Sequence, residues 1–491
     1  MLLGIRFNKI SRWRTSPVIS ASHAFHFNGY FSTTSPLEEL RFLAESNEDT
    51  FLPWLERKAE MKISSVLSIG KSSIGRFLFA SETIRAGDCI LKVPFNVQIS
   101  PDVLPLPIKN LLGNEIGNVA KLAVVVLLEQ KLGSGSEWAP YITRLPQPWE
   151  MHNTMFWNES ELEMIRNSSL YEESLNQRSQ IEREFLAIRK ALETFPEIID
   201  RINCDDFMHA HALVTSRAWR STEGVSLIPF ADFLNHNGAS EAMVLNDYDK
   251  QLSEVIADRD YAPGEQVLIR YGKYSNATLM LDFGFALPYN IHDQVQVQVK
   301  TDKDDPLARI KLEIWLRSCT PGTEYVRGVY STGNSFTIRE VRCATGKGRG
   351  LPQSLRAFAR ILSCSNPQGL YLPLYWLSFL YWHDSDILLV LVYCTELNEL
   401  STEAVNGDGR LARIPLKNVN KEVEAHQILL SQFKQLVEEY NASIEALEPV
   451  DSPCLCKKLA WRRLMAHHLL TGELRILKSA IAWLEKYCDA I

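Results

Sequence analysis

The sequence predicts an α+β protein. A mostly-β domain (residues 51–303) contains a helical insert (about residues 100–224) and is followed by an all-α C-terminal region (residues 304–491). Two turn-and-strand runs, RAGDCILKV and APGEQVLIR, have similar chemistry but lie far apart in the chain. Apolar residues between them recur at helical spacing, which indicates one β domain interrupted by helices.

The expected strands alternate with short turns. Residues 76–80 favour a strand, Ala86-Gly87-Asp88 favours a turn, and residues 89–93 favour a strand that returns beside the first. Residues 242–245 and 254–257 flank another turn. We therefore expect two hairpins, one on each side of the insert.

The insert is expected to consist of helices. Residues 119–130 form one apolar helical run, and residues 159–191 combine mixed charges with apolar residues at helical spacing. A further helix begins near Cys204. Asp205 or Asp206 is its expected N-cap, because a carboxylate can accept the free N–H groups of a first helical turn.

Long helices also dominate the expected C-terminal region. Residues 421–447 and 459–487 place apolar side chains three to four positions apart, with Gly472 dividing the second run into two helices. Every packed helix needs such an apolar face. We therefore interpret these stripes as core and not as a cofactor site.

The composition indicates an ordinary globular protein with a mildly acidic charge. Lys plus Arg number 52 and Asp plus Glu number 59, which gives a net charge of -7. A nucleic-acid binder needs a basic face, so this balance argues against one. The most apolar stretch, residues 370–393, is interrupted by Pro373 and by polar residues, whereas a membrane span needs about 20 continuous apolar residues. We expect a monomer that binds neither nucleic acid nor membranes.

The nine cysteines are scattered and predict no metal site. None forms a C-x-x-C pair, and only Cys454 and Cys456 lie close together. Structural zinc needs paired ligands at short spacing. The pair His209 and His211 also lacks the i, i+4 spacing with a carboxylate that a metal site would have. Free thiols in a reducing compartment are the simpler interpretation.

Residues 1–37 differ from the rest of the chain. They contain Arg6, Lys9, Arg12 and Arg14 and no acidic residue, which is typical of an organelle transit peptide for a chloroplast or mitochondrion. The alternative is a disordered tail on a cytoplasmic or nuclear protein. Without this segment, the four lost basic residues would change the net charge from -7 to -11.

Two glycine-containing runs fall short of nucleotide-binding motifs. Gly70-Lys71-Ser72 lacks the earlier glycine of a phosphate loop, because Ser65 stands there. The run GKGRG, residues 346–350, does not follow an expected strand. We interpret it as a flexible basic loop.

The run FADFLNHN is the first candidate for a functional site. Asp232, Asn235 and His236 lie together among apolar residues where a strand meets a turn. Clustered polar groups need partners and are often sites, although an Asn-His pair is also ordinary turn chemistry. A second run, YGKYSNA, begins at Tyr271 and is followed by LDFGF, which contains Phe283.

The order of three motifs resembles the SET-domain lysine methyltransferases. SSIGRFLFASETIRAGDCILKVP comes first, DFLNHN follows the helical insert, and YGKYSNATLMLDFGF follows in turn. The resemblance covers about residues 51–299 and is greatest to the branch typified by plant Rubisco large-subunit methyltransferase. The helical region after it is similar to the substrate-binding domain of that branch.

The resemblance implies a cofactor and roles for particular residues. S-adenosyl-L-methionine would be bound by the backbone of Ile74-Gly75-Arg76 and by Arg217, Asn235 and His236. Tyr271 matches the catalytic tyrosine of the family. Arg217, Asp232 and Phe283 fall at positions near the target lysine, and no metal is implied.

The implied activity is methylation of a lysine in a non-histone protein substrate, by in-line transfer from the cofactor to a neutral amine. Two residues depart from the family pattern. Phe77 stands where a glycine is usual in the cofactor strand, and Phe283 replaces a tyrosine common in plant members. The alternatives are therefore a catalytically weakened SET fold that acts as a protein-binding module, and a methyltransferase directed to histidine, as in a related branch.

Overall fold

The structure is a computed structural model. It describes residues 43–44, 50–72, 75–196, 200–221, 224–302, 304–305, 307–318, 334–345, 347–364, 414–448 and 456–491. Structural statements below concern these residues. The expected transit peptide or tail, residues 1–37, lies outside them. No helix in the described part is both long and apolar enough to cross a membrane.

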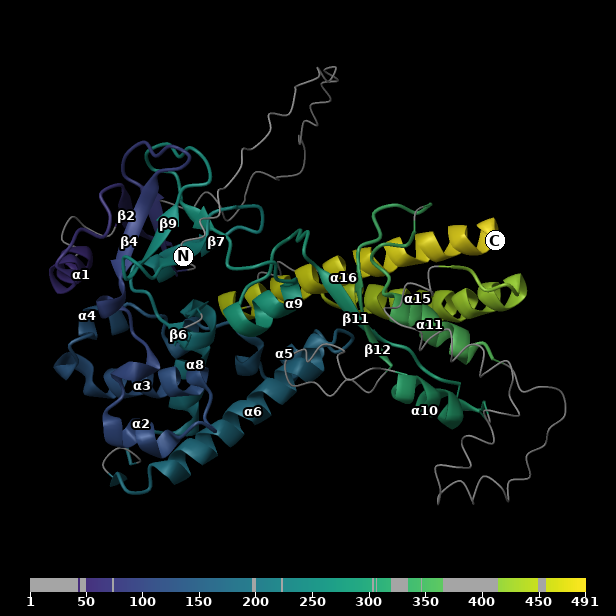
Figure 1. Ribbon diagram of the computed structural model, residues 1–491, viewed down its shortest axis with the longest axis horizontal. Helices are drawn as coiled ribbons and strands as arrows, with labels where there is room; N and C mark the ends of the chain where they lie inside the picture. The colour runs from purple at the N-terminus through teal and green to yellow at the C-terminus, as the bar shows by residue number, and fades with distance from the viewer. Residues whose placement is uncertain are drawn as a thin grey trace, which may run out of the picture. The chain divides into compact units, whose positions relative to one another are not determined.

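Small sheets surround the first apolar core. The strands are β1 (Leu43–Ala44), β2 (Leu67–Ser72), β3 (Gly75–Ala80), β4 (Cys89–Pro94), β5 (Trp219–Ser221), β6 (Gly224–Ser226), β7 (Asn235–His236), β8 (Val244–Asp247), β9 (Leu252–Ile256) and β10 (Leu268–Ile269). The orders β1-β2-β3 and β4-β9-β8 are antiparallel, β5 pairs antiparallel with β6, and β7 pairs in parallel with β10. Figure 1 shows β4 and β9 side by side. Alternate side chains such as Leu78, Val93 and Val255 are fully buried between these sheets and the helices of the insert.

The hairpin expected around Gly87 is wrong, whereas the one formed by β8 and β9 is confirmed. The turn at Gly87 exists, but β3 pairs with β2, and β4 pairs with β9. The second turn-and-strand run instead pairs with β3, because the N–H of Val267 donates to the carbonyl of Leu78 at 2.9 Å. Just before the two runs begin, Ile84 pairs with Tyr261. The two similar runs are thus spatial neighbours, because each strand finds its partner far along the chain.

Six helices make up most of the described insert. They are α2 (Leu106–Leu112), α3 (Asn118–Leu132), α4 (Ala139–Ile142), α5 (Glu159–Glu163), α6 (Leu170–Ala191) and α8 (Cys204–Arg217). Helix α3 is buried on successive residues from Leu122 to Leu127 and packs against α8 (Figure 1). The expected N-cap of α8 is wrong: Asn203 is the cap, and its Oδ1 accepts the N–H of Asp206 at 2.8 Å.

The C-terminal region builds a second core. Its elements are β11 (Gln294–Gln298), α10 (Ala308–Ser318), β12 (Ser335–Arg339), α11 (Gln353–Leu362), α15 (Val419–Ala446) and α16 (Lys457–Ala490), and α15 lies along α16 (Figure 1). The α+β class with a helical insert and a helical C-terminal region is confirmed, with β12 as an added strand that pairs with β11. The domain limits stay a prediction.

One expected helix break is absent. Helix α16 continues through Gly472, where a side-chain Cβ would lie 2.4 Å from Oδ2 of Asp293. This glycine therefore serves close packing and does not end a helix.

Buried polar contacts join the insert to the C-terminal helices. Arg462 of α16 pairs with Glu161 of α5 at 2.5 Å. Glu473, also on α16, accepts hydrogen bonds from Ser168 at 2.9 Å and from Tyr440 of α15 at 2.8 Å. Such buried groups need these partners to offset their lost hydration.

Candidate functional site

The parallel pair β7–β10 brings the two sequence motifs together. Asn235 lies opposite Leu268 and His236 opposite Ile269, so Tyr271 follows the second strand beside His236. The backbone N–H of Tyr271 donates to Nδ1 of His236 at 3.1 Å. Burial, reinforced by nearby His292, lowers the pKa of His236 to about 4. Its ring is therefore neutral near pH 7, with the proton on Nε2.

Tyr271 is held at both its backbone and its hydroxyl. The hydroxyl donates to the carbonyl of Leu234 at 2.6 Å, and the ring stacks on Phe283 with centroids 5.2 Å apart. Burial raises the pKa of Tyr271 above its ordinary value. The phenol consequently stays protonated near neutral pH and can orient a partner through its oxygen without acting as a general base.

Aromatic rings surround Tyr271. Phe283 also lies 5.6 Å from Tyr274, and Phe285 lies 5.9 Å from His236, both measured between ring centroids. Gly284 separates the two phenylalanines with φ of 76°, a backbone conformation that glycine adopts without strain. Sequence reasoning missed Tyr274 and Phe285, although both stand inside the two motifs that it singled out.

A buried polar group lies next to these rings. Oδ2 of Asp232 accepts from the Tyr141 hydroxyl at 2.9 Å and from Nη1 of Arg217 at 3.2 Å, and Nη1 also donates to the Asp232 carbonyl at 2.9 Å. Burial raises the pKa of Asp232, and the Arg217 guanidinium opposes that rise. Phe230, two residues before Asp232, has a strained backbone with φ of 75°. Tyr141 comes from α4, and no motif in the sequence pointed to it.

Two atoms of this group lack protein partners. Among the described residues, Nε of Arg217 and Oδ1 of Asp232 are buried without a hydrogen bond. The structure thus leaves one donor and one acceptor for a bound molecule, since buried polar atoms are normally paired. The amide of Asn235, which is half-buried on β7, likewise has no described hydrogen-bond partner.

The first motif lies on β3, which packs against the turn that carries Asp232. Gly75 has φ of 126°, and no atom lies within 4 Å of where its Cβ would be. Nη1 of Arg76 donates to the carbonyl of Arg144 at 2.6 Å. Ile74 lies outside the described residues. The structure therefore brings Arg217, Asp232, His236, Tyr271 and Phe283 into one site, with Asn235 beside them and β3 along one side.

Phe77 packs within its own sheet. It lies opposite Gly70 in the β2–β3 pair, and a Cβ on Gly70 would come within 2.5 Å of its ring. Only 4% of Phe77 is exposed. The ring thus occupies the space that the missing side chain of Gly70 leaves open.

Residues 75–272 match the SET domain family. The matched stretch begins at β3, includes the whole helical insert and ends just after Tyr271. Residues 75–272 are therefore similar to a SET domain, and the resemblance seen in the three motifs is confirmed.

Methyltransferases from different kingdoms are among its relatives. The chloroplastic ribulose-1,5-bisphosphate carboxylase/oxygenase large subunit N-methyltransferase of Pisum sativum is 27% identical over 289 residues, which are 54% of this chain and 56% of that protein. The actin-histidine N-methyltransferase of Xenopus tropicalis is 28% identical over 261 residues, which are 50% of this chain and 44% of that protein. The chain thus spans about half the length of the curated relatives that it matches.

A solved structure supports the fold beyond the SET domain. Rubisco LSMT bound to sinefungin and monomethyllysine superposes with a TM-score of 0.64 and 20% sequence identity, and the match covers 90% of this chain and 93% of that one. At this identity, the likeness concerns the fold. It extends over both the first and the second core described above.

Proposed function

We propose that this protein is an S-adenosyl-L-methionine-dependent methyltransferase that modifies a lysine of a non-histone protein. The observation that carries the proposal is the position of Tyr271. Its hydroxyl is fixed 2.6 Å from the Leu234 carbonyl, and its ring lies among His236 and Phe283. An apolar, aromatic setting with one fixed phenol suits a reaction that needs alignment and exclusion of water.

The residues around Tyr271 fit the cofactor. The unpaired Nε of Arg217 can donate to the carboxylate of its amino-acid end. The amide of Asn235 and the Nε2 proton of His236 offer further hydrogen bonds, and open space beside Gly75 allows backbone contact. When bound, S-adenosyl-L-methionine supplies a methyl group on a positively charged sulfur.

The chain's own residues would prepare the lysine. Burial among aromatic rings, next to the Arg217 guanidinium, lowers the pKa of an amine and favours its neutral form. Oδ1 of Asp232, which has no described partner, can accept a hydrogen bond from that amine. The Tyr271 oxygen can accept weak C–H···O contacts from the methyl group and so orient it.

A histidine target is the second candidate. The actin-histidine N-methyltransferase of Xenopus tropicalis is as similar to this chain as the Rubisco enzyme of pea, 28% against 27% identity. An imidazole is already neutral near pH 7 and would not need the pKa shift that a lysine needs. The same transfer assay distinguishes the two targets, because mass spectrometry locates the methyl group on one residue type.

We also propose that the protein acts in an organelle. The basic, acid-free composition of residues 1–37 supports this, and the pea relative is named chloroplastic. Fusion of these residues to a fluorescent protein tests the proposal. Diffuse fluorescence throughout the cytoplasm and nucleus would contradict it.

The activity is tested with the purified chain, isotope-labelled cofactor and a cell extract. We expect a labelled protein band with the wild type, and a loss of about 100-fold or more in rate with Tyr271→Phe, since one positioned polar group is worth about that much. Cofactor binding by calorimetry should persist in Tyr271→Phe. If the wild type binds the cofactor but labels no protein, the weakened binding-module alternative is favoured. If it binds no cofactor, the enzyme proposal fails.

A further inference from the structure

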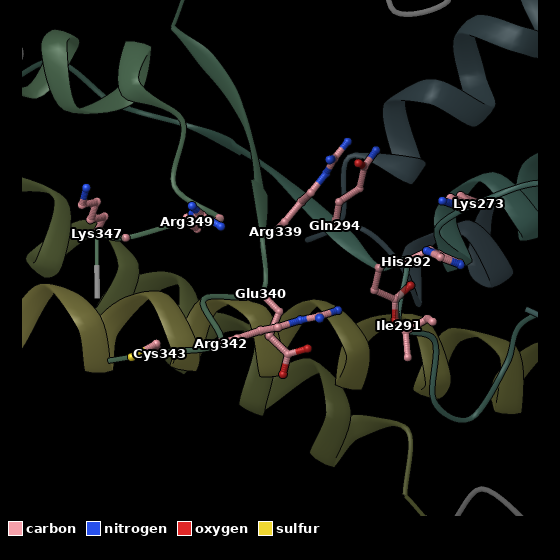
Figure 2. A pocket seen from close by; sticks show the side chains of 13 residues that line it. Lys273, Ile291, His292, Gln294, Arg339, Glu340, Arg342, Cys343, Lys347 and Arg349 are labelled. Atoms are coloured by element: carbon pink, nitrogen blue, oxygen red, sulfur yellow. The ribbon is translucent and has the colours of Figure 1, made fainter. Parts of the chain in front are cut away.

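A hollow of about 830 Å³ lies beside the C-terminal core, and five of its 13 lining residues are lysine or arginine. Lys273 lines it on one side, and Arg339, Arg342, Lys347 and Arg349 line it from β12 and the loop that follows (Figure 2). All five side chains are exposed, and among the described residues none has a carboxylate within 4.0 Å. Unpaired cations around one hollow attract an anionic ligand.

The two acidic residues of the lining do not neutralise these cations. Asp293 and Glu340 both face Arg475 of α16, whose nitrogens lie 3.8 and 3.6 Å from their carboxylates. Arg475 thus already balances part of their charge. The hollow keeps an excess of positive charge, although the chain as a whole carries a net charge of -7.

The basic loop is held in place by its glycines. Gly348 has φ of 64° and lies so close to Trp483 that a Cβ would come within 2.7 Å of the ring. Gly350 has φ of 124°, and its carbonyl accepts the N–H of Arg339 at 2.9 Å. The described part of the GKGRG run, residues 347–350, is therefore packed on the core. It presents Lys347 and Arg349 on a fixed backbone.

We propose that this hollow binds an acidic segment of the protein substrate, an inference that rests on the proposed function. Lys273 stands two residues after Tyr271, so their Cα atoms are at most about 7 Å apart. A segment bound at Lys273 would therefore run close to the reacting centre. A peptide suits the hollow better than a nucleic acid, because its backbone N–H groups can donate to Asp293 and Glu340, whereas a sugar-phosphate backbone has no such donors.

The test measures binding of fluorescein-labelled deca-glutamate to the full chain by anisotropy at 50 mM salt. Arg342→Glu/Arg349→Glu reverses two cations of the hollow. Arg183→Glu/Arg189→Glu makes the same change on exposed arginines of α6 and is the matched control. We expect affinity to fall about tenfold or more in the first variant and less than twofold in the control, because only nearby charges act strongly at this salt. Higher salt should also weaken wild-type binding.

The same binding experiment compares deca-glutamate with two other ligands, deca-glutamine and the oligonucleotide dT10. Deca-glutamine should bind at least about tenfold more weakly than deca-glutamate, since it lacks the charge. Any of three results would overturn the inference. Both peptides bind equally, or both double variants bind deca-glutamate equally. The third is that the oligonucleotide dT10 binds more tightly than deca-glutamate and loses the same affinity in Arg342→Glu/Arg349→Glu.

Calorimetry with S-adenosyl-L-methionine is run on the same proteins. If the cofactor binds and a protein is methylated while deca-glutamate does not bind, only the acidic-segment inference fails. If deca-glutamate binding depends on Arg342 and Arg349 but no cofactor binds, the methyltransferase proposal fails instead. If the wild type binds both the cofactor and deca-glutamate, Arg342→Glu/Arg349→Glu should raise KM for an acidic lysine-containing peptide and leave kcat unchanged.

Discussion

The hydroxyl of Tyr141 donates a 2.9 Å hydrogen bond to Oδ2 of Asp232, and so connects α4 of the helical insert to the polar group of the site. Both side chains are buried. The insert is therefore part of the site's construction, since it supplies one of the two groups that hold the Asp232 carboxylate. The other is Arg217 at the end of α8.

Tyr141→Phe tests this connection. Loss of the hydroxyl leaves the buried carboxylate with one donor fewer, so we expect the free energy of unfolding to fall by about 1–3 kcal/mol. Methyl transfer should fall with it, because Asp232 is less firmly positioned. Tyr261→Phe is the matched control: it removes a 3.0 Å bond to Asp258, which is partly exposed and has other donors. Urea unfolding and transfer rates check the two variants, and an equal loss of activity in both would contradict the assignment.

Phe77→Gly tests whether the unusual residue in the first motif obstructs the cofactor. Because the ring packs on Gly70 and is buried, we expect its removal to lower the free energy of unfolding by about 3–5 kcal/mol. Affinity for S-adenosyl-L-methionine, measured by calorimetry below the unfolding temperature, should not rise. Phe79→Gly on the same strand is the control, with a smaller expected loss, since Phe79 is only half-buried. A large gain in affinity for Phe77→Gly would instead support a weakened cofactor pocket.

Glu473→Gln is expected to change the pH dependence of stability. Burial raises the pKa of Glu473 to about 8, so the folded protein retains its proton while the unfolded chain loses it near pH 4.5. The stability that this group contributes is thus fully present below pH 4.5 and is lost as the pH rises through about 8. A neutral glutamine avoids that loss.

Urea unfolding at pH 5, 7 and 9 measures the effect of Glu473→Gln. At pH 9 the variant should exceed the wild type by at least about 2 kcal/mol, and the difference should shrink towards pH 5. Glu485→Gln, at an exposed pair with Lys434, should show little pH-dependent difference. A constant difference at all three pH values would mean that Glu473 is ionised in the folded protein.

Gly472→Ala is expected to destabilise α16 although alanine is the better helix former. Its Cβ would lie 2.4 Å from Oδ2 of Asp293, and the displaced carboxylate should cost about 1–3 kcal/mol in unfolding free energy. Asp293→Ala should reduce that cost when the two changes are combined, which a double-mutant cycle measures. Thr471→Ala, an exposed neighbour, should change stability by less than about 0.5 kcal/mol. Additive effects of Gly472→Ala and Asp293→Ala would rule out the contact.

The sequence alone was sufficient for the features that depend on local patterns. Apolar spacing predicted α3 and α15 closely, and the order of three motifs pointed to Asp232, His236 and Tyr271, which the fold brings close together. Local patterns were insufficient where a strand or a side chain contacts a residue far along the chain. It paired β3 with β4 because a turn separates them, and it divided α16 at Gly472 because glycine is common at helix ends.

The tertiary structure decided the contacts between distant segments. Tyr141 meets Asp232 across 91 positions of the chain, and Asp293, which lies just before β11, fills the space at Gly472. The parallel pairing of β7 with β10 places Tyr271 beside His236. The fold also brings Lys273 to the same hollow as Arg339, Arg342, Lys347 and Arg349, which are distant from it in the sequence. The physical reason is that helical periodicity and turn chemistry act over a few residues, whereas burial and hydrogen-bond pairing of polar groups are satisfied only when the whole chain has folded.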